Sequence, residues 1–283
     1  MNPLVEIEKL GQSVWIADLE RDAIGSGELA RLIEQDGVRG AIAGESLDVE
    51  DVRLAADLLR PVFEQSRGMD GFISIEIPAG SIAQNIDRSN VMVQAPATRQ
   101  GLAAVEAWLA QSIPVQATHM FSLRHCEALA CAWHPSRPAL LASFSVSPVD
   151  TEVDHALENL GTPEALDLRG KIAIANAKAI YQRHGEIYGG GRMPRLLWAC
   201  TSTRNPAYSD VRYVEELIGP GTIMALSPAT LRAFREHGRV RGATVTQGVH
   251  EAHERLARLA ALGIDLPGLN LTTTYEKFHA IYV

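Results

Sequence analysis

Two carboxylates stand where short apolar, β-rich runs of the sequence end. Asp18 follows the run VWIA, and Glu76 lies within FISIEI. Another run, VMV, meets Gln94, and Thr118 lies within VQATH. Two carboxylates in one pocket can act as a general acid and a general base when their surroundings push their pKa values apart. A carboxamide and a hydroxyl beside them can orient substrate hydroxyls or a water.

These residues need elements that bring them together, and the sequence predicts such elements. Short β-rich runs alternate with longer stretches of helical periodicity, which is typical of parallel βαβ units. The runs are Val14–Ala17, Val38–Ala43, Phe72–Ile77, Val91–Val93, Val115–His119, Ala142–Val146, Leu196–Cys200 and Thr222–Ala225. Helical stretches include Asp51–Phe63, Leu102–Ala110 and Leu168–Arg183. The alternation predicts an α/β fold, a closed (β/α)8 TIM barrel. A doubly wound open sheet gives the same local pattern, but no Gly-rich dinucleotide fingerprint follows any run.

In such a barrel the chemistry lies where the strands end, so polar residues after each run are expected to meet at one mouth. Besides the four residues above, this rule selects Gly44, Glu45, Ser46, His119, Ser145, Ser147, Thr201 to Arg204 and Ser227. Such a mouth suits a polyhydroxylated substrate. Strand alternation sends His119 to the side opposite Thr118, which favours a structural histidine facing a helix. Turned into the mouth, it would be the only imidazole there.

The composition narrows the function further. The 283 residues carry a net charge of −8 and are 46% hydrophobic, which is typical of a globular protein and predicts one domain over residues 1–283. The charge argues against nucleic-acid and anionic-membrane partners. No window resembles a signal peptide or a bilayer span, so a cytoplasmic protein is expected. Cys126, Cys131 and Cys200 form no CxxC, so we expect buried thiols and no metal site or cofactor.

Five long phrases carry a family resemblance. They are VWIADLERDAIGSGELARLIEQDGVRG, PATRQGLAAVEAWLAQSIPVQATHMFSL, VSPVDTEVDHALENL, LRGKIAIANAKAIYQR and LLWACTSTRNPAYSDVRYVEELIGPGTIMALSPATL. In order, and from about residue 10 to about residue 278, they resemble the transaldolase family in its long bacterial form. The resemblance implies a class I aldolase barrel of carbohydrate metabolism, as in the pentose phosphate pathway. In this family a fourth-strand lysine forms a Schiff base with a ketose phosphate and passes a three-carbon unit to an aldose.

The position that corresponds to this lysine is Gln94. The family phrase resembles IKIPAT, whereas this chain reads VQAPAT. A carboxamide nitrogen is delocalised into its carbonyl and cannot add to a ketone as an amine does. The resemblance therefore implies a family member without its defining nucleophile.

Other family roles carry over one position at a time. Asp18 matches the aspartate that moves a proton on and off the substrate hydroxyl. Glu76 and Thr118 match the pair that positions a water for Schiff-base formation and hydrolysis. Gly44, in IAGES, stands where the family has an asparagine that orients substrate hydroxyls, and Ser46 of the same phrase is assigned to substrate binding.

The phosphate-binding positions match less well. Ser147 matches a serine that touches the substrate phosphate, but Pro148 follows it where close relatives have an arginine. Arg204 lies near a position where the family uses a cation for the same group. His119 is assigned to substrate binding as well.

Several hypotheses follow. The first is a transaldolase-like enzyme that acts on a sugar, sugar phosphate or sugar-derived metabolite by acid/base chemistry of Asp18 and Glu76. The second is ordinary transaldolase chemistry with Lys277 as a relocated lysine, since Lys171 and Lys178 are expected to face water. The third is a non-catalytic binding or scaffold protein derived from the family. A metal-dependent aldolase is a weaker option because the mouth lacks a ligand cluster. The partner expected is a small carbohydrate-like molecule, and a homodimer stays open.

Overall fold

The strands form one closed barrel in which each pairs in parallel with its neighbours in chain order. The computed structural model describes residues 2–76, 87–132, 134, 138–189, 193–266 and 269. The strands are β1 (Ser13–Leu19), β2 (Val38–Ala43), β3 (Ile73–Ile75), β4 (Val91–Pro96), β5 (Val115–Met120), β6 (Leu140–Ser145), β7 (Arg195–Ala199) and β8 (Thr222–Leu226). The predicted (β/α)8 barrel is confirmed, and each strand lies at its predicted place.

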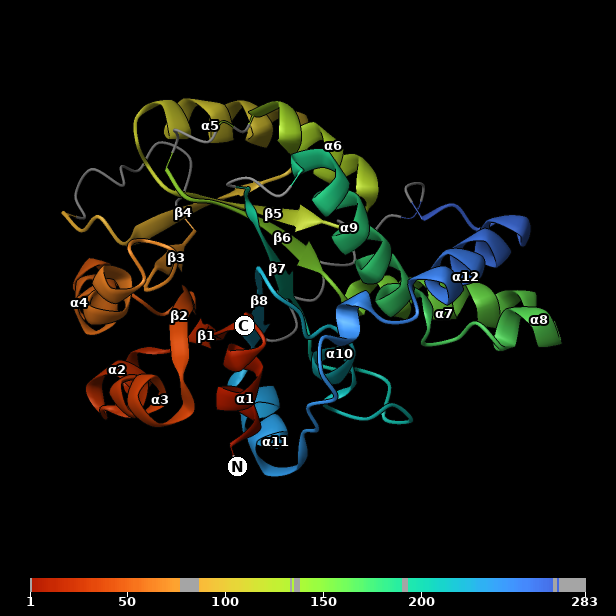
Figure 1. The fold of residues 1–283 in the computed structure, drawn as a ribbon, viewed down its shortest axis with the longest axis horizontal. Coiled ribbons are helices and arrows are strands. Elements are labelled where there is room, and N and C mark those ends of the chain that lie inside the picture. The colour runs from red at the N-terminus through yellow and green to blue at the C-terminus, as the bar shows by residue number, and fades with distance from the viewer. Residues whose placement is uncertain are drawn as a thin grey trace.

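Helices surround the barrel (Figure 1). They are α1 (Pro3–Lys9), α2 (Arg21–Gly25), α3 (Glu28–Asp36), α4 (Val49–Gln65), α5 (Arg99–Ala110), α6 (Leu123–Ala132), α7 (Ser147–Leu160), α8 (Pro163–Leu166), α9 (Ile172–Tyr188), α10 (Arg212–Glu216), α11 (Pro228–His237), the 3-10 turn η2 (Thr244–Thr246) and α12 (Val249–Ala261). α12, drawn in blue, packs along α9, and α1 packs against α11.

Two boundaries differ from the sequence prediction in ways that matter. β4 continues to Pro96, so Gln94 lies inside the strand and not beyond its end. α9 begins at Ile172 and not at Leu168, because Gly170 has a φ of +64° and interrupts the helix. Ile77 lies outside the described residues, and the single-domain organisation stays a prediction.

Alternation along each strand separates an outer core from a smaller inner one. Outward residues such as Val14 and Ile16 pack against the helices, whereas Trp15 belongs to an inner cluster. Its other buried members are Phe72, Met92, Leu141, Leu197, Ile223 and Ala225. Gly40 makes room for the Trp15 ring, since a Cβ there would lie 2.3 Å from a ring carbon. The barrel is therefore filled by side chains and is not an open pore.

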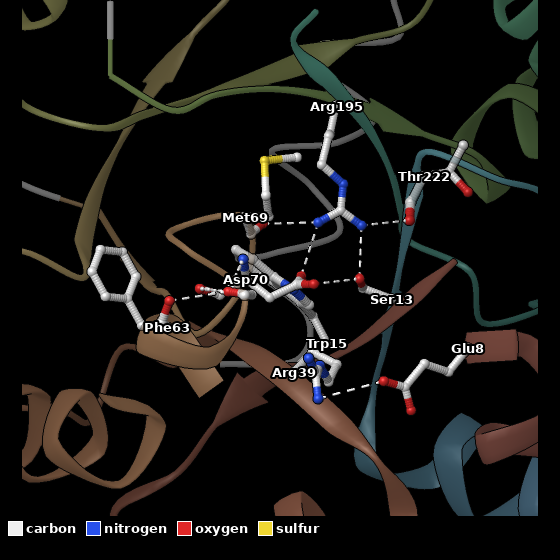
Figure 2. A network of polar contacts seen from close by, with 10 residues as sticks. Glu8, Ser13, Trp15, Arg39, Phe63, Met69, Asp70, Arg195 and Thr222 are labelled. Carbon is white, nitrogen blue, oxygen red and sulfur yellow. Dashed lines mark hydrogen bonds and ion pairs between the residues drawn. The ribbon is translucent and has the colours of Figure 1, made fainter. Parts of the chain in front are cut away.

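A charged network closes the N-terminal end of the barrel (Figure 2). The Arg195 guanidinium donates to Asp70 Oδ1 at 2.9 Å, to Ser13 Oγ at 2.7 Å and to the carbonyl of Thr222 at 3.0 Å. Ser13 Oγ donates to Asp70 Oδ2 at 2.8 Å. The Arg195 and Asp70 side chains are each only 11% exposed. β1, β7, β8 and the segment before β3 are thus joined by one buried ion pair.

The long α9 helix corrects one expectation. Lys171 is half-buried in the turn before the helix, but Lys178 is 7% exposed and donates to Glu216 Oε2 at 3.1 Å. The expectation that Lys178 faces water is wrong, because α12 and η2 cover this side of α9. Within the described ranges, no helix is both long and apolar enough to cross a bilayer.

Arg195→Met tests the network at the base. Removing one partner leaves the Asp70 carboxylate buried and unpaired, so we expect the free energy of unfolding to fall by about 3–5 kcal/mol. Urea denaturation followed by circular dichroism measures this change. The control is Arg183→Met on α9, whose ion pairs with Glu127 and Glu186 are exposed and stabilise little. Equal losses in the two variants would contradict the role of the buried pair.

Candidate active site

Gln94 points into the barrel. Its neighbours along β4, Val93 and Ala95, belong to the outer core, and Met92 belongs to the inner cluster. Gln94 is half-buried and pairs in register with Gln116 of β5. Side chains paired in register across parallel strands lie on the same face, about 4.8 Å apart at the backbone. Gln116 therefore also points inward.

The same reasoning assigns inward side chains to layers, each supplied by alternate strands. The layer at the mouth holds Ala17, Glu76, Thr118 and Ala199, the next holds Ile42, Gln94, Ser143 and Ala225, and the third holds Trp15, Ser74, Gln116 and Leu197. Exposure agrees with this descent: Glu76 is exposed, Gln94 half-buried and Gln116 only 2% exposed. Three of the predicted catalytic residues, Glu76, Gln94 and Thr118, thus share one sector.

The interior has two different walls. Above the apolar Phe72, Met92 and Leu141, the strands β3 to β6 and the residue after β3 contribute polar side chains: Ser74, Glu76, Gln94, Gln116, Thr118, Ser143 and Ser145. β7, β8, β1 and β2 contribute apolar ones: Leu197, Ala199, Ala225, Trp15, Ala17 and Ile42. The alanines opposite the polar wall have small side chains. Such an arrangement places several hydrogen-bonding groups on one side of a ligand and excludes water from the other.

Asp18 reaches the mouth through a break in the β1 pairing. Ile16 and Leu19 both face the outer core, and the register with β2 shifts between them. Two residues, Ala17 and Asp18, therefore occupy the inner side where a regular strand has one. Asp18 adopts a φ of +53° and is exposed. Left-handed backbone at a residue other than glycine is strained and is often found at active sites.

β5 repeats this irregularity at His119. Ala117 and Met120 face the outer core, the register with β6 shifts between them, and His119 has a φ of +58°. Regular alternation does not hold at His119, so alternation alone does not assign its side chain to the outer face. Thr118 is 7% exposed and His119 half-buried.

Cys200 shows that distant segments converge at this mouth. It follows β7 and has a φ of +52°. Burial raises the pKa of its thiol to about 11, and the Asp18 carboxylate raises this pKa too, while a hydrogen bond with Ser145 and the charge of Arg204 lower it. Residues of β1, β6 and the segment after β7 therefore surround one atom. A thiol with this pKa is protonated at neutral pH.

The end of β2 differs from the rest of the mouth. A Cβ on Gly44 would lie 2.9 Å from the carbonyl oxygen of Leu19, so a larger residue here would need movement of β1. Ser46 is exposed, and its hydroxyl donates to Glu20. Ser46 lines, together with Glu20, Arg21 and Asp22, a hollow of about 410 Å³ at the rim beside β1. This hollow lies beside the mouth and not over Gln94.

Ser147 opens α7 directly after β6 and is 3% exposed. One turn later, Asp150 fixes this helix to the start of α9 and to α10. Its Oδ1 accepts from the N–H of Ala173 at 2.7 Å, and its Oδ2 accepts from the Tyr213 hydroxyl at 2.9 Å. Burial raises the pKa of Asp150 to about 6, although both hydrogen bonds lower it. Pro148 occupies the first turn and offers no N–H to an anion.

Other predicted mouth residues serve the fold or lie at its edge. Thr201 Oγ1 donates to the carbonyl of Ala225 at 2.8 Å, and Ser227 caps α11 by accepting from Thr230 N. Arg204 is exposed in the segment after β7. Lys277 lies outside the described residues. Among the residues that the structure describes, no cluster of histidine, cysteine and carboxylate side chains could hold a metal ion.

Sequence reasoning missed Gln116 and Ser74. Both have enclosed side-chain oxygens without a hydrogen-bond partner in the described part of the chain. The signal was present, because each stands two positions before a predicted site residue, Thr118 or Glu76, and so shares its face of the strand.

A closed (β/α)8 barrel with polar groups gathered at the C-terminal ends of its strands has the architecture of barrel enzymes. The sequence matches the family model of transaldolase/fructose-6-phosphate aldolase over residues 25–279. The chain belongs to this family.

Several curated relatives named transaldolase are similar to this chain over most of its length. The chain is 35% identical to a transaldolase of Parafrankia sp. over 331 aligned positions, which cover 93% of this chain and 90% of the relative. It is 35% identical to a transaldolase of Mycolicibacterium smegmatis, with 94% and 90% covered, and 36% identical to transaldolase 2 of Nostoc sp., with 92% and 88% covered. The alignments exceed the 283 residues of the chain, so these relatives carry internal segments that it lacks.

The Asp150 carboxyl predicts a pH effect on stability. Its pKa is raised from 3.8 to about 6, so between these values the folded state binds more protons than the unfolded state. Its contribution to the free energy of unfolding therefore falls as pH rises through this window and is constant above it. We expect the free energy of unfolding of Asp150→Asn, relative to wild type, to increase from pH 4 to pH 6.

Urea denaturation at several pH values measures this difference. Asp167→Asn is the control, because hydrogen bonds with Lys171 and Arg258 lower the pKa of this exposed carboxyl and its effect lies below the window. The prediction is wrong if the two variants show the same pH dependence between pH 4 and pH 6.

Proposed function

We propose that this protein is a transaldolase-like enzyme that acts on a sugar, sugar phosphate or sugar-derived metabolite without a fourth-strand Schiff-base lysine. The observation that carries the proposal is the position of Gln94. It occupies the inward site of β4, with Glu76 directly after β3, Thr118 on β5 and Asp18 at the β1 irregularity. The relatives named transaldolase support a carbohydrate-type substrate.

The position of each residue in the barrel suggests its role in the reaction. Asp18 and Glu76 move protons to and from the substrate, and Thr118 and Gln94 orient hydroxyls or a water. Ser147, Gly44 and His119 line the bound substrate, with Arg204 and Ser46 at the rim. The two carboxylates approach from different strands, so they can act on opposite parts of one small molecule. Enolisation, isomerisation, dehydration and retro-aldol cleavage all suit this arrangement.

Wild-type protein is predicted to form no covalent adduct with a ketose. Incubation with fructose 6-phosphate and sodium borohydride, followed by intact-mass measurement, tests this, because borohydride reduces an imine to a stable amine. An unchanged mass is expected, since an amide nitrogen does not form the imine. A trapped adduct that disappears in Lys277→Ala would instead support ordinary transaldolase chemistry by a relocated lysine.

Asp18→Asn and Glu76→Gln serve as companion variants in turnover assays. Each keeps the shape of the side chain and removes the carboxylate, so loss of turnover with unchanged ligand binding is expected. If ligand binding persists while neither wild type nor variants convert any candidate sugar, the proposal fails and the protein is a binding protein.

Gln94→Lys is predicted to restore amine reactivity toward fructose 6-phosphate. A lysine at this inward position would meet Glu76 and Thr118, which match the groups that position water for Schiff-base chemistry in the family. The same borohydride experiment should give a mass increase in Gln94→Lys and none in Gln94→Met, which has similar length and no amine. No adduct in either variant would show that the remaining site no longer supports imine formation.

A further inference from the structure

Two carboxamides lie side by side inside the barrel, and the second of them, Gln116, has no assigned role. Gln94 and Gln116 are register partners on β4 and β5. Gln94 stands one layer above Gln116, so their side chains form a descending pair from the mouth toward the centre. Glu76 and Thr118 flank this pair in the layer above.

Among the described residues, the two side chains have no hydrogen-bond partners, so their amide nitrogens are free to donate and their oxygens free to accept. Gln116 is 2% exposed, and its Oε1 is enclosed without a hydrogen bond; Ser74 Oγ, in the same layer, is 0% exposed and also unpartnered. Among the described residues, the Gln94 side chain has no hydrogen-bond partner either. An enclosed polar atom without a partner costs about 1–3 kcal/mol relative to a paired one. Gln12 also has an enclosed Oε1 without a partner, but its amide nitrogen donates to the Leu217 carbonyl and to Thr222 Oγ1, each at 2.8 Å.

We propose that Gln94 and Gln116 together donate N–H groups to the carbonyl oxygen of an α-hydroxy ketone and stabilise its enolate. The inference rests on the proposed function and names the groups that stabilise the negative charge formed when the carbon–carbon bond breaks. An amide offers two N–H donors and carries no charge, and donors fixed inside a barrel need no rearrangement as negative charge develops on the oxygen. The apolar wall of Ala17, Ala199 and Ala225 keeps this region poor in water, which strengthens such hydrogen bonds.

The step balances within the site. In retro-aldol cleavage, Asp18 takes the proton of the hydroxyl on the β-carbon, the bond between the α- and β-carbons breaks, and an aldehyde forms. The electron pair of that bond moves into the enolate, whose oxygen accepts from the two amides. Glu76 then gives a proton to the α-carbon and restores the ketone. One proton is taken and one is given, and no oxidant or further reactant is needed.

Exchange of carbon-bound hydrogen with deuterium oxide measures enolate formation without knowledge of the full reaction. Dihydroxyacetone, fructose and fructose 6-phosphate are the probes, and proton NMR follows the loss of signal beside the carbonyl. We expect wild type to catalyse exchange of at least one probe. Gln116→Leu should lower the rate by about 10²–10³-fold, the usual effect of losing one such donor.

A stability measurement separates this role from a structural one. Leucine removes an unpartnered buried amide, so Gln116→Leu should be as stable as wild type or more stable. Gln12→Leu is the matched control, because it removes two hydrogen bonds at the base of the barrel; it should lose stability and keep the exchange rate. Gln116→Leu with lower stability and an unchanged exchange rate would overturn the inference.

The failure of the inference can be told from failure of the proposed function. Exchange that is lost in Glu76→Gln but kept in Gln116→Leu leaves the acid/base proposal intact and removes the role of the amides. No exchange of any probe by wild type overturns the proposed function together with the inference that depends on it.

Discussion

The packing of the barrel interior depends on the ion pair between Arg195 and Asp70 at its N-terminal end. A closed barrel has an interior that must be filled, and here its lowest level holds a guanidinium bonded to Asp70, Ser13 and the Thr222 carbonyl. A buried ion pair is tolerated only when its remaining donors and acceptors are satisfied. This one is satisfied by four separate segments, so it fixes the register of β1, β7 and β8. Trp15 then fills the space above it and forms part of the floor of the site.

The alternation of side chains along each strand explains both the position of the site residues and the backbone strain beside them. Because every second side chain of a strand points inward, Glu76, Gln94 and Thr118 lie in one sector of the interior. In a regular strand, the residue directly after an inward one points outward. Asp18 and His119 each follow an inward residue directly, and at both the regular strand is interrupted by a positive φ. The strain of order 1–3 kcal/mol at each site is sustained by the rigid barrel. A less firmly closed barrel would relax these bends and withdraw Asp18 from the mouth.

Alternation explains how far the sequence could predict the molecule. The eight strands were found because parallel strands leave continuous apolar runs, and Gln94 was noticed because it interrupts one. The bends at Asp18 and His119 could not be predicted, because aspartate and histidine adopt positive φ more often than other non-glycine residues but still at only a few per cent of positions. Lys178 was misplaced because its partner, Glu216, is distant in the sequence. Gln116 and Ser74 were visible as polar residues within strands but acquire meaning only when the barrel closes and their oxygens are enclosed without partners.

The family resemblance suggests that Gln94 stands in place of a lysine. This replacement changes which group can take up the electron pair released when a carbon–carbon bond breaks. An imine takes up an electron pair through a covalent, cationic nitrogen, whereas a ketone must hold it on oxygen as an enolate. Two neutral amides stabilise an anion less than a covalent cation does, so the rest of the site has to contribute more. The apolar wall and the enclosed position of Gln116 do so by limiting water. Gly44 and Pro148 add no amide side chain and no cation, so recognition depends chiefly on the polar wall of β3 to β6. Substrate binding and charge stabilisation are therefore tied to the same few side chains, and a change in one should alter the other.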